Sequence, residues 1–142
     1  MICSHSFYLI CVGSWTHTAS IVSQISGSKE FSNGGVTVYG STVAVVGGKD
    51  DNEVEIHSDT GTYSATVSVS DPKGVSMYGN VLAVQNDASI FIFEKITGSW
   101  TQTASHTSNA YKNVQMYSNF VVGGSTGEYH GCSVHTHIMC TS

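Results

Sequence analysis

Residue types that bind metals are concentrated near the C-terminus. Cys132, His135, His137 and Cys140 follow one another with two, one and two residues between them. Thiolate and imidazole are ligands that zinc favours in tetrahedral sites. In a single strand the two cysteines would share one face and the two histidines the other, whereas a loop can gather all four. The segment is therefore a zinc candidate, and the alternative is a terminal strand with incidental histidine and cysteine.

Acidic residues offer a second kind of chemistry. Asp50 with Asp51, or Glu53 with Glu55, could act as paired carboxylates, and the two glutamates would share a strand face. A solvated turn or sheet edge explains the same residues. The sequence contains no Gly-X-Ser-X-Gly elbow, phosphate-binding glycine loop or His-Glu-X-X-His motif. We therefore expect a protein that is not an enzyme.

The remaining cysteines and histidines leave alternatives open. Cys3 and Cys11 lie near one end of the chain, opposite the C-terminal pair, so the four either form a disulfide between the ends or are small buried hydrophobic residues. His17 and His106 lie in or next to two similar Trp-Thr segments. Because histidine titrates near pH 6.5, they either make assembly acid-dependent or simply decorate exposed strands.

Composition excludes several classes of partner. The 142 residues carry a formal net charge of −5, with five Lys and no Arg, which argues against a nucleic-acid partner. No apolar run approaches the roughly 20 residues of a membrane-spanning helix. The apolar run at 7–12 is interpreted as a strand and not as a signal peptide, because it belongs to a repeat. An extracellular or virion surface is the favoured location.

A repeat is the strongest pattern in the chain. Tyr39, Tyr78 and Tyr117 are separated by 39 and 39 residues, within similar segments at 36–48, 75–85 and 114–124. A second element, Gly-Ser-Trp-Thr-X-Thr-Ala-Ser, occurs at 13–20 and 98–105, with a weaker copy at 61–67. These copies contain Trp15, Trp100 and Tyr63. The recurring rings are expected to pack between repeats, and the alternative is a platform that binds sugar or peptide.

Each repeat contains four short strand-like runs separated by turn residues, which predicts an all-β fold of antiparallel four-stranded units of the propeller type. We expect one repeat domain over 1–142. It contains outer strands at 7–20, complete repeats at 36–69 and 75–105, and a partial repeat at 114–138. Pairing of the two chain ends would complete the third unit.

These residues resemble a known family. A Tyr-Gly-X-X-Val-Ala-Val-Val-Gly-Gly segment, an acidic turn, an apolar strand and Gly-Ser-Trp-Thr-Gln together resemble the FG-GAP repeat of integrin-α-like β-propellers. The resemblance covers about 110 to 130 residues. It implies a propeller fold and places a candidate Ca²⁺ loop at Asp50, Asp51, Asn52 and Glu53. No other cofactor is implied.

Three units are too few for a closed propeller, which typically has 4–8 blades. We therefore expect a homo-oligomer, with a six-bladed dimer as the simplest closure, or association with other protein subunits. The expected function is a non-catalytic structural or interaction module in a surface, virion or filament. The alternatives are an adhesion or glycan/protein-binding propeller with a Ca²⁺ loop, and a zinc-binding protein. The same pattern fits a fragment of a longer propeller.

Overall fold

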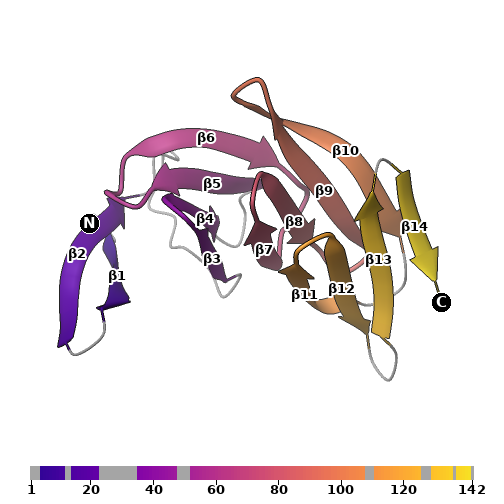
Figure 1. Cartoon of the computed structure of the whole chain (residues 1–142), viewed down its shortest axis with the longest axis horizontal. Helices are drawn as coiled ribbons and strands as arrows, with labels where there is room; N and C mark the ends of the chain where they lie inside the picture. The colour runs from indigo at the N-terminus through magenta and orange to yellow at the C-terminus, as the bar shows by residue number, and fades with distance from the viewer. Residues whose placement is uncertain are drawn as a thin grey trace.

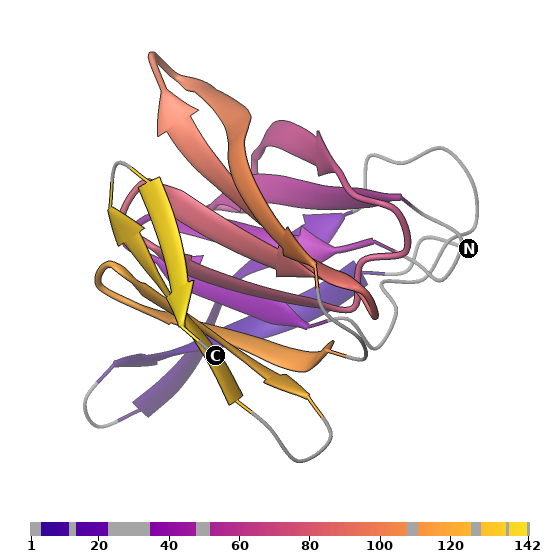
Figure 2. The ribbon, with the colours of Figure 1, turned by 90° about the vertical axis from the view of Figure 1, so that its right-hand side faces the viewer.

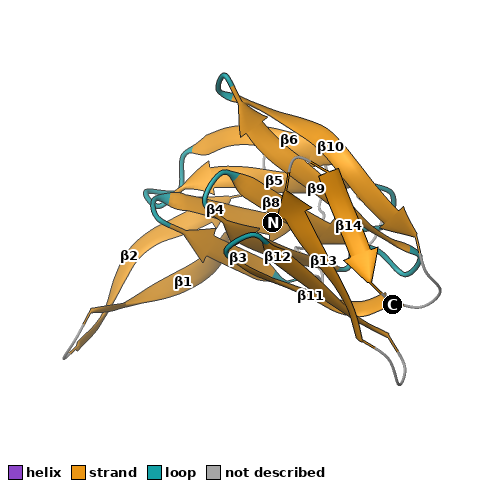
Figure 3. Ribbon diagram, turned by 45° about the vertical axis from the view of Figure 1, so that its right-hand side comes forward, coloured by secondary structure: helices purple, strands orange, loops and turns teal. Residues whose placement is uncertain are grey.

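The chain folds entirely into β-structure in its described part (Figure 3). This computed structural model describes the backbone of residues 4–11, 14–22, 35–47, 52–107, 111–125, 129–135 and 137–141, and the side chains of 20–21, 35–47, 52–107 and 111–124. Within these ranges every strand pair is antiparallel. No described segment forms a helix that could span a lipid bilayer.

The described residues form three four-stranded sheets and one hairpin. The N-terminal hairpin is β1 (Ser4–Cys11) and β2 (Ser14–Val22). The first unit is β3 (Val36–Tyr39), β4 (Thr42–Val46), β5 (Glu53–Ser58) and β6 (Tyr63–Ser68). The second unit is β7 (Gly74–Tyr78), β8 (Val81–Gln85), β9 (Ser89–Ile96) and β10 (Ser99–Thr107). The third unit is β11 (Tyr111–Tyr117), β12 (Phe120–Ser125), β13 (Tyr129–His135) and β14 (His137–Thr141).

Within each unit the strands lie in sequence order, and the units follow one another as a fan from the N-terminal hairpin to the third unit (Figure 1). Figure 2 views the same fan from the third-unit end. The first strands of the units, β3, β7 and β11, lie side by side. Thr37 Oγ1 accepts the Met77 N–H at 3.1 Å, and Ser76 Oγ accepts the Met116 N–H at 2.8 Å. The 39-residue repeat is therefore a repeat of structure.

The burial of β4 follows from its composition. The continuous apolar run at 43–46 predicts a strand covered on both faces, and its four residues are all 8% exposed or less. Alternate residues of this strand contact different neighbours. Ala44 and Val46 belong to a core shared with the second unit, whereas Val43 and Val45 pack with Ile21 of β2. The first unit therefore buries apolar residues on two sides.

Two larger cores lie between consecutive units. The core between the first and second units is closed from the second unit by Val75, Met77, Leu82, Val84 and Phe93. The core between the second and third units joins Ala83, Ile90 and Ile92 to Tyr111, Val114 and Val121. Opposite faces of the second unit thus supply the two cores, as expected for a sheet with neighbours on both sides.

The third unit differs from the sequence-based expectation. The partial repeat expected at 114–138 forms four strands of its own between Tyr111 and Thr141. In the described residues, β1 pairs with β2 and neither joins the third unit. The pairing of the chain ends was therefore the wrong prediction, because the C-terminal segment turns back on itself as the β13–β14 hairpin.

One glycine is required by close packing. A Cβ on Gly123 of β12 would lie 2.4 Å from Ile90 Cδ1 and 2.6 Å from the ring of Tyr111. The equivalent positions in the other units are Val45 and Val84, since all three are spaced by 39 residues. In the third unit the fully buried Tyr111 ring takes the place of the valine side chain.

We expect Gly123→Ala to destabilise the protein by about 1–3 kcal/mol, because the added methyl group overpacks the core between the second and third units. Urea unfolding followed by circular dichroism measures this change. Val122→Ala is the matched control on the same strand, since Val122 is 40% exposed and its truncation removes little buried area. Equal effects of the two substitutions would contradict the packing argument.

Candidate functional site

The first unit exposes apolar residues where the other units bury them. Val36 and Val38 of β3 are 45% and 55% exposed. Their equivalents 39 residues later, Val75 and Met77, are 8% and 5% exposed, and Val114 of the third unit is 3% exposed. The side chains are similar, so the difference arises from their place in the fan. No described residue covers this part of the first unit.

The exposed valines and the N-terminal hairpin lie on one side of the first unit. Val36 is opposite Val45 and Val38 is opposite Val43, and cross-strand partners share a face of a sheet. Val43 and Val45 are covered by Ile21 of β2. We call this side the leading face. Its part on β4 is covered by the N-terminal hairpin, and its part on β3 is open.

The third unit carries the corresponding open surface at the other end of the fan. Phe120 and Val122 of β12 are 57% and 40% exposed. They alternate with Val121, which is buried against the second unit, so they point away from that unit. Ala83, the equivalent of Val122, is fully buried in the second unit, and Val81, the equivalent of Phe120, is half-buried there. We call this side the trailing face.

A buried polar pair lies on the leading face. Glu55 and His57 of β5 are 0% and 1% exposed, and His57 Nε2 lies 2.8 Å from Glu55 Oε2. The edge of the imidazole also meets the ring of Tyr63, with centroids 5.8 Å apart. His57 Nδ1 is buried and has no hydrogen-bond partner among the described residues. Strand pairing puts Glu55 opposite Val45 and His57 opposite Val43, so the pair lies on the leading face of the first unit.

Glu55 and His57 stand at positions where the second unit has aromatic residues. Strand pairing makes Phe91 and Phe93 the second-unit counterparts of Glu55 and His57. The interpretation of Glu55 as part of a solvated edge was wrong, since the side chain is fully buried. The sequence signal that could have shown this is the spacing of two residues, which places an acid and a histidine side by side on one strand face.

The repeated tyrosines form a row. Tyr39 and Tyr78 have ring centroids 4.8 Å apart, and Tyr78 and Tyr117 have centroids 6.1 Å apart, both pairs tilted. Each tyrosine precedes a turn whose next residue has positive φ, which is 56° and 60° at Gly40 and Gly79. The three rings thus lie at corresponding positions of the three units. The rings are partly exposed, and Tyr117 most of all at 78%.

The segments that contain Trp15, Tyr63 and Trp100 are similar in sequence, but the structure does not place all of their rings at equivalent positions. Trp100 packs against the core between the first and second units, and its buried Nε1 has no partner among the described residues. Tyr63 lies opposite His57, but the residue opposite the equivalent Phe93 is Gln102, so Tyr63 and Trp100 are not equivalent. The side chain of Trp15 lies outside the described residues. Of the rings in these segments, Trp100 is the one whose packing between units the described residues show.

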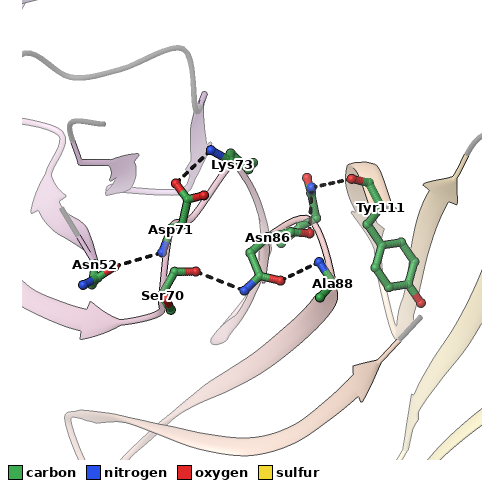
Figure 4. Close-up of polar contacts among 8 residues, drawn as sticks. Asn52, Ser70, Asp71, Lys73, Asn86, Ala88 and Tyr111 are labelled. Atoms are coloured by element: carbon green, nitrogen blue, oxygen red, sulfur yellow. Dashed lines mark hydrogen bonds and ion pairs between the residues drawn. The ribbon is translucent and has the colours of Figure 1, made fainter. Parts of the chain in front are cut away.

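The candidate Ca²⁺ loop is only partly described. Asp50 and Asp51 lie outside the described residues. Asn52 is exposed, and its Oδ1 accepts the backbone N–H of Asp71 at 3.0 Å (Figure 4). Glu53 begins β5, opposite Ser68. Asn52 therefore connects the loop between β4 and β5 to the loop between β6 and β7.

The loop after the first unit is joined to the β8–β9 loop of the second unit by further polar contacts (Figure 4). Asn86 Nδ2 donates to the Ser70 carbonyl, and its Oδ1 accepts the Ala88 N–H, both at 3.0 Å. Gln85, which is 1% exposed, donates to the Tyr111 carbonyl at 3.0 Å. These amides fix the crossings from each unit to the next, and sequence reasoning did not single them out.

The ion pair in the same region is exposed. Lys73 Nζ lies 2.8 Å from Asp71 Oδ1, and this hydrogen bond raises the pKa of Lys73 above its ordinary value. Exposed pairs of this kind contribute little to stability because water and salt screen them. The pair therefore orients the loop and does not form a chemical site.

The zinc candidates are placed by backbone only. Cys132 lies opposite Cys140, and His135 lies opposite His137, in the β13–β14 hairpin. The single strand and the loop weighed from sequence are thus replaced by two paired strands. The side chains of these residues lie outside the described part. Among the side chains that are described, no three His, Cys, Asp or Glu residues are grouped as metal ligands would be.

His106 has a structural partner. Its Nδ1 is hydrogen-bonded to the hydroxyl of Tyr111, and the side chain is half-buried. The interpretation of His106 as exposed decoration was therefore wrong. The hydrogen bond joins the last strand of the second unit to the first strand of the third. The side chain of His17 lies outside the described residues.

Comparison with known proteins identifies fold similarity alone. No family model and no curated protein matches the chain. The crystal structure of the computationally designed Ika4 protein is similar, with a TM-score of 0.64 and 14% sequence identity. The match covers 87% of this chain and 77% of Ika4. Such low identity supports the arrangement of strands and says nothing about function.

The Glu55–His57 pair gives a prediction for stability. His57→Ala should destabilise the protein by about 3–5 kcal/mol, because it leaves the buried Glu55 carboxyl without its imidazole partner. The double substitution Glu55→Leu with His57→Phe should cost much less than His57→Ala, since it replaces the pair with apolar side chains as in the second unit. Urea midpoints measure both. A double variant less stable than His57→Ala would contradict this expectation.

The tyrosine row gives a second prediction. Tyr78→Ala removes two ring contacts and Tyr117→Ala removes one, and each aromatic pair is worth about 0.5–1.5 kcal/mol beyond its buried area. Tyr78→Ala should therefore lower the free energy of unfolding by more than Tyr117→Ala does. Thermal and urea unfolding of both variants check the order. A larger loss for Tyr117→Ala would show that the ring contacts along the row do not determine the stability of these variants.

Proposed function

We propose that this chain is a non-catalytic structural and interaction module of the β-propeller type that functions within a larger protein assembly. The supporting pattern is a 39-residue unit that forms a four-stranded antiparallel sheet and is repeated in a fan. Sheets that meet face to face through repeated inner strands are characteristic of propellers. The three complete units supply part of such a ring.

One observation carries the proposal. Val36 and Val38 are about half exposed on the leading face, although the same positions are buried in the second unit. Phe120 and Val122 of the trailing face are likewise more exposed than Val81 and Ala83 at the same positions of the second unit. Exposed apolar surface at positions that a repeat normally buries marks a site of contact with other protein. Both ends of the fan are therefore suited to burial in an assembly.

The form of the assembly is constrained by the N-terminal hairpin. A dimer closed directly to six sheets would place the third unit of one copy against the leading face of another. The hairpin already covers Val43 and Val45 on that face through Ile21. A complete four-stranded sheet would thus have to displace it. We therefore favour completion of the leading face by a smaller element and association of other protein subunits with the trailing face.

The two alternative functions, calcium-dependent binding and zinc binding, have less structural support. Calcium-dependent adhesion or glycan binding needs free oxygen ligands in the acidic turn, but the Asn52 side-chain oxygen already accepts the Asp71 N–H. A zinc-binding role rests on the register of the β13–β14 hairpin alone. The open faces remain the feature with the most structural support.

We expect the isolated chain to associate through its trailing face as its concentration rises, and we expect the double substitution Phe120→Ser with Val122→Ser to weaken this association at least tenfold. Both side chains are exposed, so the variant should keep its fold. Sedimentation velocity over a concentration series measures the mass. Ile96→Ser is the control, because Ile96 is 47% exposed but lies in β9, next to the β9–β10 turn.

Two results would contradict the proposal. One is a chain that stays monomeric up to high micromolar concentration and does not bind a hydrophobic dye such as ANS. The other is association that Ile96→Ser weakens as much as the double substitution does, since the contact would then lie away from the trailing face.

A further inference from the structure

We infer that Cys132 and Cys140 form a disulfide bond across the β13–β14 hairpin when the chain reacts with a low-molecular-weight disulfide such as oxidised glutathione. The two residues are direct partners in the antiparallel pairing of these strands. Strand pairing puts them on the face of the third unit that carries Val121, opposite to the face of Phe120 and Val122. The inference therefore does not depend on the trailing face or on the proposed function.

The hydrogen-bonding pattern of the third unit can be followed from its first turn. Tyr117 and Phe120 close a two-residue turn, so their main chains exchange hydrogen bonds. Hydrogen-bonded and non-hydrogen-bonded pairs alternate along an antiparallel ladder, which makes Met116 and Val121 a non-hydrogen-bonded pair. In agreement with this, the Met116 N–H donates to Ser76 Oγ of the second unit and not to β12.

The same alternation decides how close the two cysteines lie. The main-chain groups of Val121 are directed to β13, so Val121 and Cys132 form a hydrogen-bonded pair. Cys132 thereby uses its N–H and C=O towards β12, which makes Cys132 and Cys140 a non-hydrogen-bonded pair. The Cα atoms of such a pair are about 4.5 Å apart. Disulfides span Cα separations of roughly 4.4–6.8 Å, so the register places the two cysteines within bonding range.

The first unit shows that side chains at this pair of positions meet across the strands. Strand pairing makes His57 and Tyr63 the equivalents of Cys132 and Cys140. The two rings contact edge to face, with centroids 5.8 Å apart. Tyr63, on the edge strand, is 43% exposed. In the first unit this edge position is therefore open to a small molecule.

The other cysteines are placed less favourably. Cys11 lies opposite Ser14 in the β1–β2 hairpin, so it has no cysteine as its cross-strand partner. Figure 1 shows β1 and β14 at opposite ends of the fan. Cysteines whose Cα atoms are more than about 7 Å apart cannot be bridged without movement of the backbone. Cys3 lies outside the described residues. The register thus favours a bond within the hairpin over a bond between the ends of the chain.

The bond forms by thiol–disulfide exchange. One cysteine thiolate attacks a sulfur of oxidised glutathione, which gives a mixed disulfide and releases the first glutathione thiolate. The second cysteine thiolate attacks the protein sulfur of the mixed disulfide and releases the other glutathione. One S–S bond forms in the protein and one breaks in glutathione. Two electrons pass from the cysteines to glutathione, and the two cysteine protons end on the released thiols.

The cross-link holds the outermost strand of the third unit. In the described residues β14 pairs with β13 alone and is the edge of its sheet. Edge segments with few neighbours open locally at a lower free-energy cost than the core strands of the same protein. A covalent bond from β14 to β13 limits this opening. The oxidised hairpin should therefore exchange its amide hydrogens more slowly than the reduced hairpin.

The test is disulfide mapping of the full chain by mass spectrometry. Reduced protein is treated with oxidised glutathione, its free thiols are blocked with iodoacetamide, and it is cleaved after lysine. Peptide 113–142 then contains Cys132 and Cys140, and peptide 1–29 contains Cys3 and Cys11. We expect unlinked peptide 113–142 to have lost two hydrogens and to carry no blocking group. Hydrogen exchange in β14 should slow about tenfold on oxidation.

Two variants control for the other cysteines. The double substitution Cys3→Ser with Cys11→Ser should keep both the loss of two hydrogens and the slower exchange in β14. Cys140→Ser should lose both responses, because Cys132 then has no partner in the hairpin. Both variants replace a thiol with a hydroxyl of similar size, and the mapping of the unchanged chain does not depend on either.

Four results would overturn the inference. The first is peptide 1–29 linked to peptide 113–142, which would show a bond between the chain ends. The second is blocking of both thiols of peptide 113–142 after treatment with oxidised glutathione. The third is protection of these thiols without loss of hydrogens until a chelator is added, which would show a zinc site. The fourth is equal hydrogen exchange of β14 in the oxidised and reduced protein.

Discussion

Face-to-face burial of consecutive sheets is the interaction on which the rest of this structure depends. A sheet whose inner strands are apolar on both faces is stable only when another sheet covers each face. The second unit meets this condition, with Leu82 and Val84 buried towards the first unit and Ala83 towards the third. The same condition fails at the ends of the fan. Exposure of Val38 and Phe120 is therefore a consequence of position, since equivalent side chains are buried or half-buried elsewhere.

Hydrogen bonds between neighbouring inner strands fix the spacing that this packing needs. A hydroxyl at position 37 or 76 accepts an amide from the next unit, so each sheet is held in register with the one that follows. Buried amides at the loop crossings add a second set of connections, with Gln85 donating to the Tyr111 carbonyl. A buried donor satisfied in this way costs little, whereas one left without a partner costs about 1–3 kcal/mol. Polar groups thus set the geometry, and apolar burial supplies most of the stability.

Departures from the repeat occur where a unit meets a different neighbour. Gly123 replaces a valine because Tyr111 fills the space, and Glu55 with His57 replaces two phenylalanines on the side that faces the N-terminal hairpin. An apolar pair would suit a sheet covered by another complete sheet. The polar pair belongs to the one unit whose preceding sheet has two strands in the described residues. Both departures are local, and the strand order of the units is unchanged.

The sequence by itself determined the all-β class, the 39-residue spacing and the strands of the first two units, because turn residues and apolar alternation act locally. It also predicted the equivalence of Tyr39, Tyr78 and Tyr117. It did not determine that 111–141 forms a complete sheet, that Glu55 is buried, or that His106 bonds Tyr111. Those outcomes depend on which sheet lies against which face. Tertiary structure alone decides such contacts, since residues of the same type are buried in the middle of the fan and exposed at its ends.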